Sequence, residues 1–143
     1  MKVERHAEAV WLGNVKEGHG SLTTDSGILK DATYGFKSRF ESGPGTNPEE
    51  LLAAAHAGCF SMAVSGALTG AGTPAERIHT KCTVTVEKQE SGFTITKSAL
   101  EVSAKVPGID AAKFEQVANG AKANCPVSKL FKAEITLQVH FEG

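Results

Sequence analysis

The sequence has little surplus charge and no long uninterrupted apolar run, and both absences narrow the classes of protein to consider. Its 143 residues carry a formal net charge of −1, with a pI of about 6.5. No attraction to nucleic acid or to an anionic membrane is therefore expected. No uninterrupted apolar run approaches the roughly 20 residues of a membrane-spanning helix. The N-terminal residues lack the apolar core and cleavage site of a secretory signal, so we expect a cytoplasmic protein.

Several signatures of bound groups and of hydrolytic catalysis are also missing. The turn glycines Gly13, Gly18 and Gly20 are followed by no helix and no Gly-Lys-Ser/Thr, which excludes a phosphate-binding loop. There is no Ser-His-Asp order and no glycine-flanked nucleophile. The histidines form no metal-ligand spacing with the cysteines. We therefore expect neither a metal nor a resident cofactor.

The composition that is present, 41% hydrophobic and 22% charged residues, is typical of a soluble globular protein. The length fits one domain over residues 1–143. The alternation of apolar and polar residues predicts strands at 2–12, 21–24, 34–41, 78–89, 93–106 and 134–142, with a bulge between Ile95 and Leu100. Helices are predicted at 48–68, at 111–123 after an Asp110 cap, and at 126–131. The order βββ-α-ββ-α-α-β indicates an α+β fold with antiparallel sheet packed on helices.

The first long helix has a clear start and an unusual composition. Asn47 is a good N-cap, Pro48 suits the first helical position, and Glu50 completes the spacing of a capping box. Residues 51–67 carry almost no charge and are mostly Ala, Gly, Leu and Ser. A helix that is apolar all round must be buried. Either it passes through the middle of the domain or a second copy of the chain covers it, and we favour an intimate homodimer.

Three cysteines, an odd number in a reducing compartment, favour reactive chemistry over a disulfide framework. Cys59 lies within the long apolar helix. Cys125 stands directly before Pro126, where a helix start offers unpaired N–H groups and a positive dipole end that favour thiolate. Cys82, on an apolar strand face, is interpreted as structural filler. Two interpretations of Cys59 and Cys125 remain open: they form a peroxide-reducing pair, or they are two small buried hydrophobic residues.

Three side chains near the long helix could support a reactive Cys59. Arg39, on the predicted strand before the helix, could hold the thiolate as a cation, or it could be an exposed strand arginine. Glu49 is about 80° from Cys59 around the helix axis, whereas Glu50 is on the opposite side, so Glu49 is better placed to orient Arg39. His56 shares the face of Cys59 and could act as a base, although a hydrogen-bonded core histidine is the favoured interpretation.

Over essentially its whole length the chain resembles the OsmC/Ohr family of thiol-dependent peroxidases. The resemblance rests on three segments, Gly45–Ala63, Val106–Asp110 and Ala123–Ser128. The stretch Tyr34–Phe40 and the Ala-His-Ala context before Cys59 favour the OsmC branch, named for osmotically inducible protein C.

The resemblance implies an intertwined homodimer whose antiparallel sheets combine strands of both chains around two central helices. It implies that Cys59 is the peroxidatic cysteine, which becomes a sulfenic acid, and that Cys125 resolves it to a Cys59–Cys125 disulfide. Arg39 and Glu49 match the family's catalytic arginine and glutamate. The implied substrates are organic hydroperoxides, with hydrogen peroxide used more weakly, and the implied reductants are dithiols such as lipoyl groups.

The residues also allow a non-catalytic thiol protein, either a redox sensor or a ligand-binding dimer whose cysteine pair forms a disulfide as a signal. No basic patch supports a DNA-binding sensor. A purely structural stress protein is a third interpretation. Peroxide consumption separates the enzyme from both.

Overall fold

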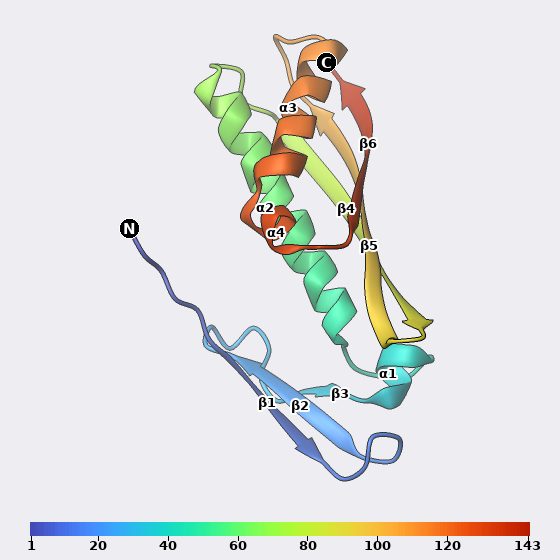
Figure 1. Ribbon diagram of the computed structural model, residues 1–143. Coiled ribbons are helices and arrows are strands. Elements are labelled where there is room, and N and C mark those ends of the chain that lie inside the picture. Colours follow the sequence, from blue (N-terminus) through green and yellow to red (C-terminus); the bar gives the residue numbers. More distant parts are fainter. The chain divides into compact units, whose positions relative to one another are not determined.

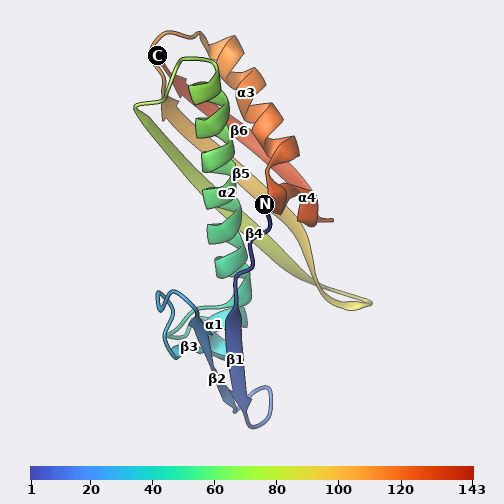
Figure 2. The same cartoon turned by 90° about the vertical axis from the view of Figure 1, so that its left-hand side faces the viewer.

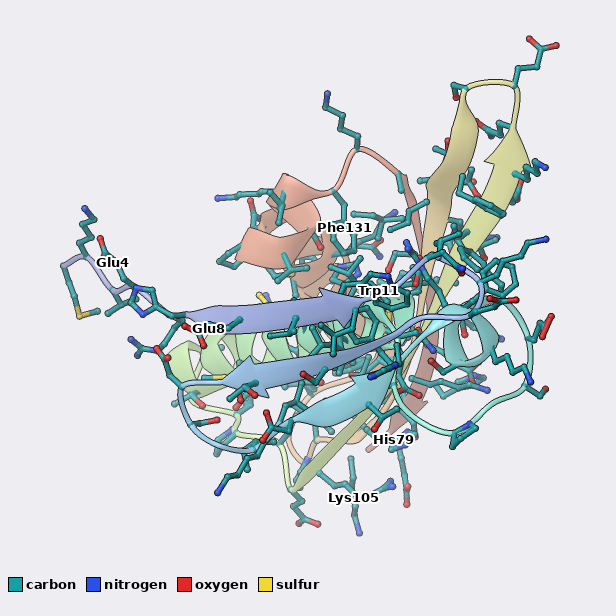
Figure 3. The ribbon with its side chains drawn as sticks, turned by 90° about the horizontal axis from the view of Figure 1, so that it is seen from below. Glu4, Glu8, Trp11, His79, Lys105 and Phe131 are labelled. Atoms are coloured by element: carbon teal, nitrogen blue, oxygen red, sulfur yellow. The ribbon has the colours of Figure 1, made fainter.

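The computed structural model describes residues 1–143, which form two compact units, Met1–Leu51 and Leu52–Gly143. The first unit contains an antiparallel meander of β1 (Ala7–Leu12), β2 (His19–Thr24) and β3 (Ala32–Tyr34), followed by the short helix α1 (Phe36–Phe40) (Figure 1). Trp11, labelled on β1 in Figure 3, meets Tyr34 edge to face at 5.5 Å between ring centroids. Gly20 lies between the two rings, where a Cβ would overlap both.

Helix α1 replaces the strand predicted over 34–41. Gly35 is extended, and the Ser38 hydroxyl accepts its N–H at 2.9 Å and donates to the Thr46 carbonyl at 2.8 Å. The chain then turns, and the Arg39 N–H donates to the Gly35 carbonyl. The rings of Phe36 and Phe40 pack together, with 5.2 Å between their centroids. Their spacing would put them on one face of a strand, but it also fits the i, i+4 spacing of a helix. The strand assignment was wrong because local capping outweighed the alternation, and Arg39 is therefore a helical residue.

The second unit packs helices on one face of a three-stranded sheet of β4 (Arg77–Gln89), β5 (Gly92–Lys105) and β6 (Glu134–Glu142). Figures 1 and 2 show α2 (Pro48–Gly70) and α3 (Ala111–Asn124) along the same face. Strands β4 and β5 are antiparallel, but β5 and β6 are parallel, so the expectation of a purely antiparallel sheet was wrong. Helix α3 and the short α4 (Pro126–Leu130) lie between β5 and β6 and provide the crossover that a parallel pair requires.

The predicted bulge is confirmed. Thr85 pairs with Lys97 and Val86 pairs with Ile95, which leaves Thr96 as the extra residue. The register change brings Ile95 of β5 opposite Val86 of β4, although the pairs before the bulge join residues of the same parity, such as Cys82 and Leu100.

The start of α2 follows the predicted cap in part. The Glu50 N–H donates to the Asn47 side chain at 2.7 Å. The Glu50 carboxylate, however, accepts the Thr46 hydroxyl at 2.7 Å instead of closing the capping box.

One stripe of α2, repeating every four residues, enters the core of the second unit. It consists of His56, Phe60, Val64 and Leu68. The stripe packs with residues of β5 and α3, among them Leu100, Val102, Phe114 and Ala118. Much of the opposite face stays exposed in the single chain, and Met62 is 78% exposed. Length and composition would also let α2 cross a membrane, a property it shares with core helices of soluble proteins.

Candidate active site

Cys59 and Cys125, which are remote in sequence, meet in the second unit. Cys59 lies on α2 and Cys125 lies between α3 and α4; both are free thiols, and Cys125 lies close enough to Cys59 to act on its thiol. Cys59 is half-buried and Cys125 is only 1% exposed. The fold therefore unites the two sulfurs, as the peroxide-reducing interpretation of the sequence requires.

The position of Cys125 follows from the junction of two helices. Its backbone N–H donates to the Ala121 carbonyl and ends α3, while Pro126 occupies the first position of α4. The Cys125 sulfur accepts the Ser128 backbone N–H at 3.4 Å, so the thiol caps the new helix. The predicted helix start at Cys125 is confirmed, although α4 is only five residues long.

Within the second unit the surroundings of Cys59 disfavour the thiolate. Burial raises the pKa of the Cys59 thiol, and the adjacent Cys125 thiol raises it further. The hydrogen bond from the Val127 backbone acts in the opposite direction. A reactive Cys59 thus needs an additional positive group beside it.

In the first unit, Arg39 and Glu49 form an ion pair with the geometry of a fork. Arg39 Nε donates to Glu49 Oε1 at 3.0 Å, and Arg39 Nη2 donates to the same oxygen at 2.8 Å. The Glu49 side chain is 8% exposed and that of Arg39 is 37% exposed. Arg39 pairs with Glu49 and not with Glu50, whose carboxylate accepts the Thr46 hydroxyl. A buried carboxylate that holds one edge of a guanidinium leaves the remaining N–H groups free to donate elsewhere.

Arg39 also borders an apolar hollow of the first unit. Its guanidinium lies 5.1 Å from the centroid of the Phe40 ring. The hollow is lined by Trp11, Val15, Tyr34, Phe36 and Phe40 together with Arg39. A fixed cation beside aromatic side chains suits a ligand with an apolar body and a polar oxygen end.

His56 is fully buried and hydrogen-bonded at both ring nitrogens. Nδ1 lies 2.6 Å from the Ser98 hydroxyl and Nε2 lies 2.7 Å from the Ser128 hydroxyl. Ser128 in turn lies 3.1 Å from the Cys125 sulfur. Burial lowers the pKa of His56, so the ring is neutral at neutral pH. The favoured interpretation of a hydrogen-bonded core histidine is confirmed as a description of its geometry.

Cys82 is more than filler, because its sulfur lies 3.2 Å from the Ser98 hydroxyl and 3.9 Å from His56 Nδ1. Neither Ser98 nor Ser128 stands out in the sequence. The available signals were the inward parity that Ser98 shares with Leu100 and the helical i, i+3 spacing of Ser128 from Cys125.

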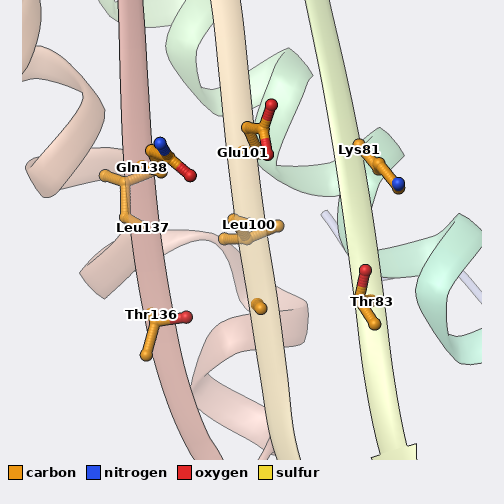
Figure 4. A pocket seen from close by; sticks show the side chains of 8 residues that line it. Lys81, Thr83, Leu100, Glu101, Thr136, Leu137 and Gln138 are labelled. Carbon is orange, nitrogen blue, oxygen red and sulfur yellow. The ribbon is translucent and has the colours of Figure 1, made fainter.

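A separate hollow lies on the outer face of the sheet of the second unit (Figure 4). Side chains from all three strands line it, among them Lys81, Thr83, Glu101, Thr136 and Gln138. It contains no thiol, so it is not the candidate active site.

Comparisons with known proteins identify the family of the chain. The sequence model described as OsmC-like protein matches residues 41–140. Peroxiredoxin OsmC of Escherichia coli K12 is 50% identical over 143 residues, covering 100% of both chains. The organic hydroperoxide resistance protein OhrB of Bacillus subtilis is 27% identical over 86% of this chain and 89% of its own.

Solved structures match as well. The crystal structure of Bacillus subtilis OhrB aligns with a TM-score of 0.68 at 25% identity, over 96% of this chain and 98% of that one. An OsmC-like protein from Vibrio cholerae shares the fold, with a TM-score of 0.77 at 16% identity over 96% of this chain and 99% of that one. The chain belongs to the OsmC family.

Proposed function

We propose that the protein is a thiol-dependent peroxidase that reduces organic hydroperoxides, and more weakly hydrogen peroxide, through a Cys59–Cys125 disulfide. The observation that carries this proposal is the contact between two free thiols from distant parts of the sequence. The 50% identity to a peroxiredoxin over the full length supports the same reaction class. As an oxidoreductase of this kind, the protein would have an antioxidant role in the response to oxidative stress.

The reaction proceeds in three balanced steps. The Cys59 thiolate attacks one oxygen of the peroxide, the O–O bond breaks, and the alcohol leaves with a proton, which makes Cys59 a sulfenic acid. The Cys125 sulfur then attacks the Cys59 sulfur, and water leaves as the disulfide forms. An external dithiol, such as a lipoyl group, reduces the disulfide by exchange and is itself oxidised. No resident cofactor takes part in this cycle.

Arg39 and Glu49 are proposed to activate the first step. Burial works against a Cys59 thiolate, so a nearby guanidinium would favour the charged form and would stabilise negative charge on the leaving oxygen. Glu49 would hold Arg39 in the orientation for this task through the fork-shaped ion pair.

The working form is proposed to be a homodimer, intertwined as in the OsmC/Ohr resemblance. The support lies in α2, whose exposed face in the second unit is built of small residues and one methionine: Ala54, Ala55, Gly58, Met62, Ser65 and Gly66. Such a face suits close packing against another chain and explains an apolar helix in a soluble protein.

Sedimentation equilibrium should therefore give twice the chain mass of 15.0 kDa. Met62→Lys should shift the protein toward monomer, because it places a charge in the apolar interface. Thr83→Lys, on the outer face of the sheet, serves as the matched control and should remain dimeric. A wild-type mass equal to one chain would contradict the dimer.

The cysteine assignment is tested by reacting the reduced protein with cumene hydroperoxide in the absence of reductant. The wild type should consume about one equivalent and stop as a disulfide. Cys125→Ser should consume the first equivalent at the same rate and then continue to sulfinic acid, because no thiol is left to resolve the sulfenic acid. Intact mass spectrometry follows the added oxygen atoms.

Cys82→Ser is the control variant and should behave like the wild type. With dithiothreitol present, the wild type should turn over cumene hydroperoxide repeatedly and faster than hydrogen peroxide. A wild type that forms the disulfide without repeated turnover would instead indicate a thiol sensor.

A further inference from the structure

We propose that His56 accepts, through the Ser128 hydroxyl, the proton that the Cys125 thiol loses as it closes the disulfide. This inference rests on the proposed peroxidase cycle and concerns its second step. Ser128 contacts the reacting sulfur directly, whereas His56 acts through Ser128 and is a positioning residue.

The three groups form a continuous chain of hydrogen-bond distances. The Cys125 sulfur lies 3.1 Å from Ser128 Oγ, which lies 2.7 Å from His56 Nε2. In the tautomer with hydrogen on Nδ1, the ring donates to Ser98 Oγ at 2.6 Å and leaves the Nε2 lone pair free. Ser128 then donates to Nε2 and accepts the S–H of Cys125. Every donor along the chain points from the thiol toward the histidine.

Burial explains why an internal proton acceptor is needed. Cys125 is 1% exposed and Ser128 is buried, so bulk water does not reach the thiol in this structure. A thiol attacks as thiolate, and its proton must therefore leave along a protein group. The Ser128 hydroxyl is the side chain that joins Cys125 to a titratable base.

The surroundings of His56 keep it available as this base. Three polar groups face it: the Cys82 thiol from β4, the Ser98 hydroxyl from β5 and the Ser128 hydroxyl from α4. The ring of Phe131, which follows α4, packs edge to face against it with 5.0 Å between the centroids. None of these is a carboxylate or a cation. Burial lowers the pKa of the ring, which keeps Nε2 unprotonated at neutral pH.

The step balances as follows. The Cys125 proton passes to Ser128 Oγ while the Ser128 proton passes to His56 Nε2, giving a thiolate and an imidazolium. The thiolate attacks the Cys59 sulfur, the S–S bond forms and the S–O bond of the sulfenic acid breaks. The departing hydroxide takes a proton from solvent at the half-buried Cys59 and leaves as water, and the imidazolium later returns its proton to solvent, so no net proton is gained or lost.

The test is a single turnover with one equivalent of cumene hydroperoxide, in which sulfenic acid formation and disulfide formation are timed separately. His56→Gln retains a donor and an acceptor but cannot be protonated, and Ser128→Ala interrupts the chain. Both should form the sulfenic acid at the wild-type rate and close the disulfide roughly 10-fold or more slowly at neutral pH.

The pH profile separates proton transfer from a merely structural role. Without the relay the thiol loses its proton only to hydroxide that reaches it through local opening, so the disulfide step of both variants should accelerate with rising pH. The wild type should lose its advantage at acidic pH as His56 becomes protonated. Thr83→Ala, on the outer face of the sheet, should leave the disulfide step unchanged.

Two results would overturn the relay. One is a disulfide step in either soluble variant as fast as in the wild type at neutral pH, which would mean that the sulfenic hydroxyl takes the proton directly. The other is a slowing that is equal at all pH values, which would indicate packing alone. A wild type that forms no sulfenic acid would count against the peroxidase proposal instead, so the two failures are distinguishable.

Discussion

Cys59→Ser should abolish turnover of cumene hydroperoxide, leaving only the rate of the reductant without protein. A serine hydroxyl is not ionised at neutral pH and forms no product equivalent to a sulfenic acid or a disulfide, so the cycle has no first intermediate. The remaining hydroperoxide is measured over time with dithiothreitol as the reductant. This is the largest effect expected of any single substitution in the protein.

The substitution is nearly isosteric, and Cys59 is only half-buried, so the fold should survive. Circular dichroism and the oligomeric mass verify this. Cys82→Ser is the control, because it removes another thiol from the same unit, and it should retain turnover. If Cys59→Ser and the wild type consumed peroxide equally fast, Cys59 would not be the nucleophile.

Arg39→Ala should slow the oxidation of Cys59 by roughly 10²- to 10³-fold, the usual effect of removing one donor to a developing anion. The reason is the burial that already raises the pKa of the Cys59 thiol, because without a cation the thiolate is scarce at neutral pH. The second-order rate constant with cumene hydroperoxide measures this step directly. Alkylation of Cys59 by iodoacetamide should slow as well, since it also requires thiolate.

Raising the pH should restore part of the rate in Arg39→Ala, because hydroxide then generates the thiolate. Glu49→Gln should have a smaller effect in the same direction, since the neutral amide holds the guanidinium less firmly. Arg77→Ala, at an exposed arginine of β4, controls for the loss of positive charge in general. An unchanged rate constant in Arg39→Ala would leave Arg39 as a surface residue of α1.

Local signals in the sequence were enough for most helices and strands. Asp110 caps α3 through the Lys113 N–H, as the residue type and spacing indicate. The mismatched parity of the two long strands correctly required a bulge. The alternation of apolar and polar residues gave the wrong element at Phe36 and Phe40, whose spacing fits both a strand and a helix. The helix is favoured by hydrogen bonds of Ser38 to Gly35 and Thr46, which the alternation does not encode.

Long-range contacts of the site could not be predicted in the same way. The parallel direction of β6 depends on the crossover through α3 and α4, which no pattern within β6 encodes. The meeting of Cys59 with Cys125 was one of two interpretations that the residues left open, and the family resemblance favoured it. The serines that link His56 to both neighbouring thiols come from β5 and α4, and a polar side chain on an apolar face gives no indication of its partner.

The contact between Cys59 and Cys125 in the reduced chain also bears on how the protein would use its oxidised form. Because the two side chains are neighbours before oxidation, the bridge joins groups that the fold has already brought together. Oxidation would therefore add a covalent bond with little change in the conformation of the molecule. The reduced and oxidised forms would present similar surfaces to a binding partner. This property suits rapid reduction of the disulfide by a dithiol better than lasting signalling.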